Sequence, residues 1–521
     1  MEGKGEIVAA RIQTATMVPE GRRIAPAAHG RLVRALTENT ELLGALALMA
    51  LYFAVMSGHL ISIDGLIVYQ QGESLAYQHS MHFRTFYWGN AGVSTSSYGI
   101  GGSLIYVPTL LLAASLRPAV NPASVRSDGS IQMDWINLYN DPLYTVAVAP
   151  LFVLVTALTA YLAARFLREL GYDQRIALWG LAFVGIGSPT AVYARGDFAQ
   201  PIEALCWIAT FYTLFRFGRT RQFRYLCLSG AAIVYAVLTR QVEGALLCAA
   251  LLVMLPWFWQ QDTRRYAGYA FAGIAVAAFI GVLGTLAANW ARFGSPFDTG
   301  AYATQRWTTP LMLGISGALL SPARGILWSF PAVVLVPLGL RHLWQAQHRW
   351  VGLALLALPV AQLLNVSAWW IWFGGWDWGL RLFVPALPLL AVVAAVGVDA
   401  LTRSVRRWFP SLLLIAGVVW ALPCMLTDMD GGYAPTYGST EQSFVFHAYP
   451  PLGAWPFVSH VLATSSTDTH AIDVLWLHVA RETKNISLIV PLVLIIVALL
   501  LALRIRQVLR QSPLATMAAS K

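Results

Sequence analysis

The sequence predicts an all-α protein that crosses a membrane many times, and two observations lead to this prediction. First, 57% of its 521 residues are hydrophobic and only 12% are charged, whereas a soluble globular protein carries roughly 25% charged residues. Second, apolar runs of about 17–25 residues, the length that a helix needs to span a bilayer, recur along the chain. A transmembrane β-barrel would instead show short segments of alternating polarity, and the sequence contains none.

Thirteen apolar runs are candidates for membrane-spanning helices. They lie at 42–60, 100–116, 143–165, 176–194, 201–217, 225–240, 243–259, 267–288, 326–341, 350–368, 382–400, 411–427 and 487–506. Counted back from the Arg-rich C-terminal tail, every second loop holds several Arg residues. Positively charged loops remain on the cytoplasmic side of a membrane, so these loops and the tail are predicted to be cytoplasmic.

The run at 100–116 fits this topology least well. The N-terminal tail carries Arg22 and Arg34 and should also be cytoplasmic, which requires an even number of crossings. Because the run at 100–116 is short, begins with glycines and contains Pro108, we interpret it as a re-entrant or partly inserted helix. This leaves about 12–13 transmembrane helices, and the alternative is fourteen crossings with one unrecognised span.

The chain divides into four parts on this topology. Residues 1–41 form a cytoplasmic tail, and 42–427 a transmembrane module whose first outer loop covers 61–99. Residues 428–486 form an outer loop or lid, and 487–521 the last transmembrane helix and a cytoplasmic tail.

The loops rich in acids, aromatics, glycine and proline all fall on the outer side. Besides the first loop, they are 194–203, 239–244, 289–325, 369–381 and 428–485. An enzyme that works at the outer surface would show such a face, whereas a channel or transporter more often places its polar groups within the spans.

The net charge of +10 has two interpretations. It follows from the excess of Arg in cytoplasmic loops, or it attracts an anionic substrate, and net charge alone does not separate the two. Nucleic acid is excluded as a partner, because the Arg residues are scattered among loops and form no continuous basic face.

Two outer acids are candidate catalytic residues. Asp64 follows the first span, and partial desolvation at a membrane interface would make it a general base. An ordinary solvated loop acid is the alternative. Asp197 lies in the tight turn YARGDFAQPIEAL with Arg195 and Glu203. It could be a helix N-cap, or with Asp64 it could serve base catalysis, hydroxyl binding or metal coordination.

The rest of the first loop supplies further polar groups. His79 and His82 form an i, i+3 pair in HSMH, but a metal site needs more ligands than two, so no metal site is predicted there. With Glu73 and Arg84, these histidines are candidates for hydrogen bonds to a substrate.

Arginines are concentrated in cytoplasmic loops, so each arginine in an outer loop needs an explanation. Arg240, Arg324 and Arg381 are candidates for binding a phosphate or carboxylate through the guanidinium fork. The alternatives are ion pairs, of Arg240 with Glu243 and of Arg381 with Asp377. Trp376 belongs to a Trp-rich stretch that forms either an interfacial belt or a groove for a sugar or prenyl chain.

With these features, the chain resembles the GT-C superfamily of membrane glycosyltransferases, in particular the protein mannosyltransferase-like group. The resemblance covers roughly residues 42–400 and rests on an acid after the first span, a long aromatic first outer loop, a second outer acid and four strings. These strings are YARGDFAQP, NWARFGSPFDTGAY, LLSPARGILWSFP and WFGGWDWGLRLFVPALP.

The resemblance implies an inverting transfer of a sugar from a polyprenyl-phosphate donor to an acceptor hydroxyl on the outer face of a bacterial inner membrane. Asp64 would be the base, Asp197 the second acid, and the outer arginines, Arg195 among them, would hold the donor phosphate. Tyr302, in the string NWARFGSPFDTGAY, is a further candidate for substrate binding.

One departure from the family concerns the acid pair. Many relatives carry two adjacent acids after the first span, whereas here Gly65 follows Asp64. A mechanism with paired acids or a metal is therefore in doubt, whether Glu73 substitutes is open, and a divalent cation is the open alternative to no cofactor. The acceptor is a glycan, lipid or protein, and membrane lipids are further partners. The rival functions are a lipid or sugar-lipid transporter without transfer activity and a membrane scaffold.

Overall fold

The computed structural model describes residues 39–85, 92–115, 149–260, 264–300, 306–375, 377–402, 408–427, 439–456, 459, 472–483 and 488–511. The compact unit considered below begins at Thr40. Among its described residues, the regular secondary structure is helical apart from one short antiparallel hairpin, in which Arg84 of β1 pairs with Val93 of β2.

The principal helices follow the predicted apolar runs. They are α2 (Thr40–Val55), α7 (Ala149–Glu169), α8 (Gln174–Gly185), α9 (Gln200–Thr220), α10 (Phe223–Thr239), α11 (Gln241–Gln260), α12 (Arg264–Phe293), α15 (Val336–Gln345), α16 (Arg349–Ala368), α17 (Leu387–Thr402), α18 (Phe409–Leu426) and α24 (Ile489–Gln511). All thirteen predicted runs contain helix, which confirms the predicted all-α class.

Shorter elements connect these helices. They are α3 (Ile63–Glu73), the π-helix η1 (Ser74–Gln78), β1 (Phe83–Thr85), β2 (Gly92–Ser94), α4 (Ile100–Leu104), α5 (Tyr106–Ser115), η5 (Pro189–Arg195), α13 (Leu311–Leu320), α14 (Ile326–Ser329), η7 (Pro331–Leu335), η8 (Arg381–Ala386), α20 (Thr440–Ser443), η10 (Phe446–Ala448), α21 (Pro450–Gly453) and α23 (Leu475–Thr483).

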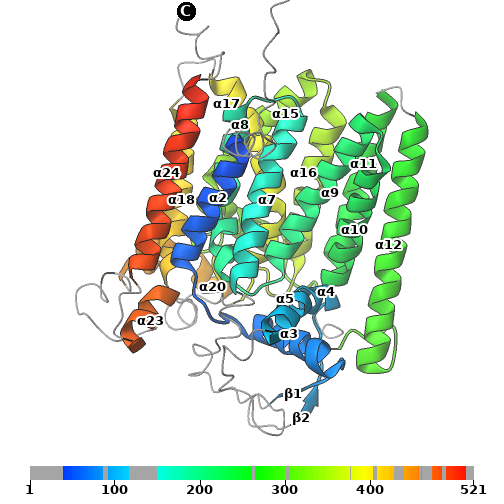
Figure 1. The fold of residues 1–521 in the computed structure, drawn as a ribbon. Helices are drawn as coiled ribbons and strands as arrows, with labels where there is room; N and C mark the ends of the chain where they lie inside the picture. The colour runs from blue at the N-terminus through cyan, green and yellow to red at the C-terminus, as the bar shows by residue number, and fades with distance from the viewer. Residues whose placement is uncertain are drawn as a thin grey trace, which may run out of the picture. The chain divides into compact units, whose positions relative to one another are not determined.

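The chain is an integral membrane protein. Among the described residues, seven helices are long and apolar enough to cross a membrane, or eight if the pair α8 and η5, bent by 58°, is one span. The shorter apolar helices α2 and α10 run beside them (Figure 1). The helices in the run at 100–116 do not run beside these spans: α4 and α5 lie at one end of the bundle with α3 (Figure 1).

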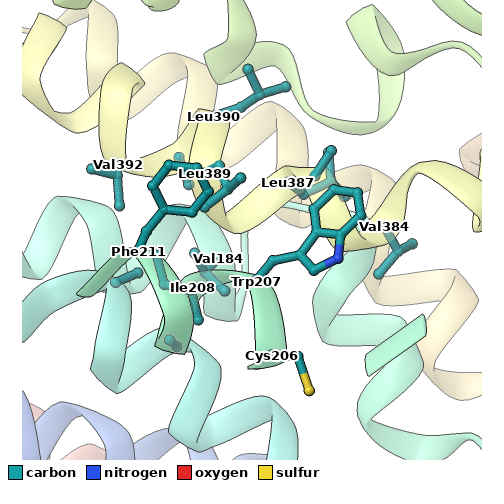
Figure 2. Close-up of a cluster of buried hydrophobic side chains, with 14 of the residues drawn as sticks. Val184, Cys206, Trp207, Ile208, Phe211, Val384, Leu387, Leu389, Leu390 and Val392 are labelled. Atoms are coloured by element: carbon teal, nitrogen blue, oxygen red, sulfur yellow. The ribbon is translucent and has the colours of Figure 1, made fainter. Parts of the chain in front are cut away.

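The hydrophobic core is centred on α17. In the apolar 18-residue window of the span Arg381–Leu401, 94% of the residues are buried, whereas none is buried in that of the span Ile489–Arg510. Trp207 and Phe211 of α9 lie beside Leu387 and Leu389 of α17 (Figure 2). The central helix therefore contacts protein, while α24 presents an apolar surface as expected beside lipid.

Close helix packing around α17 depends on glycine. A β-carbon at Gly339 of α15 would lie 1.9 Å from the carbonyl oxygen of Val393 in α17. Small residues let membrane helices approach closely in this way, which gains van der Waals contact where water cannot drive association.

One end of the bundle collects the loops that the sequence analysis placed on the outer side. Figure 1 shows α3, α4, α5, the hairpin, α20 and α23 together at that end. The hydrogen bond from Ala323 to the carbonyl of Ser443 joins two of these loops directly. The prediction that these loops share one face is therefore confirmed for their described residues.

Candidate functional site

A cavity of about 520 Å³ opens among these loops. Its polar lining includes Asp64, Arg240, Asn289 and Arg381, and its apolar lining includes side chains of α10, α12 and α16. The lining residues come from five of the six predicted outer loops and their adjoining helices. The cavity is therefore mostly apolar, with a small number of charged groups, as in sites for small molecules.

Asp64 lies in the first turn of α3 at the wall of this cavity. Its Oδ1 accepts a hydrogen bond of 2.5 Å from the Tyr98 hydroxyl, and its Oδ2 accepts one of 2.9 Å from Arg381 Nη1. The Asp64 side chain is 35% exposed, the most of any acid in this network. Its carboxylate is therefore oriented by two neighbours and still accessible to a ligand.

Asp197 has a different position although it also lines the cavity. It is buried, and its Oδ2 accepts the backbone N–H groups of Ile61 (2.8 Å) and Ser62 (3.2 Å). Its Oδ1 accepts a hydrogen bond of 2.9 Å from Ser62 Oγ, which in turn caps α3 by accepting from the N–H of Gly65. Asp197 thus fixes the start of the helix that carries Asp64.

The alternative that Asp197 caps its own helix is wrong. The N-cap of α9 is Ala199, which makes no side-chain cap hydrogen bond. Burial raises the pKa of Asp197 to about 6, although the hydrogen bonds from Ser62 and Ile61 act in the opposite direction. Asp64 and Asp197, which come from separate loops, are therefore adjoining. The carboxylate of Asp64 is accessible and that of Asp197 is buried.

Arg381 links Asp64 to a buried ion network. Arg381 Nε lies 2.7 Å from Asp377 Oδ2, so the predicted pair between these residues is present. Asp377 Oδ1 in turn accepts a hydrogen bond of 2.9 Å from Arg324 Nη1. The Arg381 guanidinium also lies 4.5 Å from the centre of the Phe198 ring. Arg381 lines the cavity and is held there from three sides.

Arg324 is fully buried and does not line this cavity. Besides Asp377, its guanidinium donates to the carbonyl oxygens of Gly375 (2.9 Å) and Gly379 (3.3 Å). It holds the loop that precedes Arg381, and the geometry does not bring it to a ligand in the cavity. Arg324 and Arg381 therefore have different positions although both were predicted to bind phosphate.

Arg240 lies between two acids at another part of the wall. Its guanidinium is 3.4 Å from Glu243, the predicted partner, and 3.6 Å from Glu203. Arg240 and Glu243 line the cavity, and Glu203 is fully buried. Both cavity arginines therefore already neutralise carboxylates, and an anion would add to these contacts or compete with them.

The remaining candidates that the structure describes are not among the residues that line the cavity. Arg195 and Glu73 are buried, whereas His79 and His82 are exposed. Arg84 pairs through its backbone in β1. Tyr302 and Trp376 lie outside the described residues.

Several residues of this site were missed from the sequence, chiefly Tyr98. Its carbonyl accepts a hydrogen bond of 2.5 Å from Arg292, which also holds the carbonyl of Ser96 at 2.8 Å. The glycines of YGIGG are the sequence feature that could have indicated this turn, because glycine allows a close approach of two backbones. A β-carbon at Gly99 would lie 2.1 Å from the carbonyl oxygen of Thr239. This close approach seats the Tyr98 turn against the end of α10.

We compared the chain with known proteins, and only the comparison of structures gave matches. No family model matches the chain, and no curated protein matches its sequence. The crystal structure of ArnT from Cupriavidus metallidurans in the apo state matches with a TM-score of 0.50 and 15% identity, over 92% of this chain and 78% of that one. The chain has the GT-C fold.

Two further structures with this fold score lower. ArnT from the same organism bound to undecaprenyl phosphate gives a TM-score of 0.47 and 14% identity, over 93% of this chain and 78% of that one. The archaeal oligosaccharyltransferase AglB from Archaeoglobus fulgidus, in complex with an inhibitory peptide and a dolichol-phosphate, gives 0.46 and 11%, over 84% of this chain and 59% of that one. The match to the apo ArnT structure confirms the resemblance predicted from the sequence, for the fold alone.

The cavity combines three kinds of chemical group. An accessible carboxylate can accept a proton, two arginines can bind an anion, and apolar helix surfaces can hold a hydrocarbon chain. Among the described residues, the one group of three side chains suited to a metal ion is His59, Asp473 and His478, and none of them lines the cavity.

Proposed function

We propose that this protein is an inverting glycosyltransferase that moves a sugar from a polyprenyl-phosphate donor to an acceptor hydroxyl, with Asp64 as the general base. The observation behind this proposal is the accessible Asp64 carboxylate, held by Tyr98 and Arg381 at the wall of a mostly apolar cavity. The GT-C fold shared with ArnT supports it.

In the proposed reaction, the acceptor hydroxyl transfers its proton to Asp64 while its oxygen bonds to the anomeric carbon of the sugar. The bond between that carbon and the phosphate oxygen breaks, and the polyprenyl phosphate leaves with the electron pair. Because one displacement occurs from the face opposite the leaving group, the anomeric configuration inverts. Asp64 then releases its proton to water.

Arg381 and Arg240 would bind the phosphate, whose negative charge grows as the bond breaks. Arg381 has two acidic partners, Asp64 at 2.9 Å and Asp377 at 2.7 Å. When the phosphate takes the place of Asp64 on Arg381, Asp377 still holds the guanidinium in position. Donor binding thereby frees the carboxylate that must accept the proton.

The apolar wall suits the lipid part of such a donor. Val237 of α10, Val282 and Leu286 of α12 and Val366 of α16 line the cavity. Trp307 and Trp369 also line it, with ring centres 5.1 Å apart. Aromatic faces of this kind suit a sugar or a prenyl chain.

The active face would be the outer one, in a bacterial inner membrane.

The first experiment tests the activity itself. Protein purified in detergent would be incubated with radiolabelled polyprenyl-phosphate sugars of several kinds, and free polyprenyl phosphate would be separated and quantified. We expect release with at least one donor, dependent on an acceptor hydroxyl. Reconstituted protein that moves the donor across a bilayer but releases no polyprenyl phosphate would favour a transporter and refute the proposal.

A further inference from the structure

A cluster of three buried side chains lies apart from the cavity. His59 follows α2, and Asp473 and His478 lie just before and within α23. The three residues are 4%, 1% and 8% exposed. Asp473 Oδ1 is 2.6 Å from His59 Nε2 and 3.1 Å from His478 Nε2. Two imidazoles and one carboxylate, which are typical ligands of zinc, thus converge on one point.

The hydrogen bonding of His59 directs its Nε2 lone pair at the Asp473 carboxyl group. His59 Nδ1 lies 2.7 Å from the carbonyl oxygen of Leu60, so Nδ1 must carry a proton and donate it. In the neutral ring, Nε2 then presents a lone pair to the carboxylate of Asp473, which is also an acceptor. Two lone pairs 2.6 Å apart repel, and either a proton shared by the two groups or a metal ion between them resolves the conflict.

The surrounding contacts favour a metal ion. Metal-bound histidines usually donate their second N–H to a carbonyl or carboxylate, as His59 does to Leu60. Metal-bound carboxylates are likewise oriented by further hydrogen bonds, and Arg195 Nη2 donates to Asp473 Oδ2 at 2.5 Å. Arg195 also donates to the carbonyls of Cys424 and Thr427 (3.2 and 3.3 Å). The contacts that would orient two of the three ligands are already in place.

The spacing requires only a small adjustment. The three ligand atoms all lie within 4.8 Å of one another. A tetrahedral zinc ion with bonds of about 2.0 Å separates its ligands by roughly 3.3 Å. Binding would therefore widen the shorter contacts and draw the longest one in, with water at the fourth position.

We propose that His59, Asp473 and His478 bind one divalent ion of the zinc class, which fastens α23 to the end of α2. Nearby hydrogen bonds join the same segments: Leu475 N–H donates to the carbonyl of Met56, and Trp476 Nε1 to that of Phe53. His59 precedes Asp64 by five residues, and Arg195 precedes Asp197 by two. The ion would stabilise the segments that position Asp64 and Asp197. This structural role is separate from the transfer reaction proposed above.

The test measures metal in the full-length protein, produced with a tag that contains no histidine. Elemental analysis of purified protein should find about one zinc per chain, and cobalt added after chelation should give the visible absorption of a tetrahedral site. His478→Gln should lose both. His342→Gln is the matched control, because it breaks another His–Asp pair, with Asp399 at 3.2 Å, and should retain the metal.

A chelator should also lower the unfolding temperature of the native protein and leave that of His478→Gln unchanged. Native protein without bound zinc and without a cobalt spectrum would overturn the proposal, and would assign the contact between His59 and Asp473 to a shared proton. This outcome does not depend on whether the variant folds. Equal metal content in the native protein and a folded His478→Gln variant would also overturn it.

Discussion

Gly65 packs directly against the carboxyl group of Asp197. A β-carbon at position 65 would lie 2.1 Å from Asp197 Cγ, so the residue after Asp64 has no room for a side chain. This contact explains why a glycine, and not a second acid, follows Asp64. The second acid near Asp64 comes from the loop before α9, and it supports the helix that carries Asp64.

Gly65→Ala is expected to destabilise the protein. Forcing extra atoms into a packed site costs about 1–3 kcal/mol, and here the atom in the way belongs to a carboxyl group held by three hydrogen bonds. Thermal unfolding in detergent would measure the effect. Gly230→Ala is the matched control, because its β-carbon would meet Ala277 at an ordinary 3.7 Å. Equal unfolding temperatures for the two variants would contradict the packing.

Asp197→Asn is expected to change how stability depends on pH. The folded pKa of about 6 lies above the ordinary 3.8, so the folded state binds the proton more tightly than the unfolded state. The resulting stabilisation is complete below pH 4 and is lost as pH rises through 6, by about 3 kcal/mol in all. Unfolding free energies between pH 4 and 8 should show this fall in the native protein. The same fall in Asp197→Asn would exclude Asp197 as its source.

Arg381→Lys should be nearly as damaging as Arg381→Gln. A lysine retains one charge but cannot contact Asp64 and Asp377 together through a planar fork. Loss of a preorganised contact to a developing charge lowers turnover by about 10²–10³-fold. Steady-state release of polyprenyl phosphate would measure it, with Arg506→Gln on the exposed end of α24 as the control. Near-native turnover in Arg381→Lys would show that a point charge suffices.

Tyr98→Phe should lower turnover without unfolding the protein. It removes the donor to Asp64 Oδ1, and a hydrogen bond to a charged group contributes about 1.5–3 kcal/mol, so we expect a fall of about 10–100-fold. Tyr77→Phe removes a comparable hydroxyl, bonded at 2.9 Å to the carbonyl of Leu110, and should retain turnover. If both variants behave alike, the effect of Tyr98 is not specific to Asp64.

Hydropathy and charge were sufficient to predict the helices and the loops that meet at one end. A lipid environment requires long apolar helices, and such helices appear directly in the sequence as long apolar runs. The same reasoning found the acids Asp64 and Asp197, because both lie in predicted outer loops close to the end of a span. It found Arg240 and Arg381 because arginines in outer loops run against the charge bias.

The sequence could not separate accessible charges from buried ones. Arg324 and Arg381 look alike in the chain, yet Arg324 is enclosed by carbonyls and Asp377 while Arg381 faces the cavity. Arg195 likewise bonds Asp473, which is 278 residues away. The pairing of His59 with Asp473 spans 414 residues. Only tertiary packing brings such partners together, and no local pattern reports it.

The most direct test of the central claim is the turnover of Asp64→Asn. The substitution preserves shape and removes the base, so polyprenyl phosphate release should fall by at least about 10²-fold, at the lower end for general-base catalysis. Donor binding, measured in parallel by native mass spectrometry, should persist. Asp173→Asn, at the N-cap of α8, should leave release unchanged because asparagine caps a helix as well as aspartate does. Native turnover in a folded Asp64→Asn variant would contradict the assignment of Asp64 as the base.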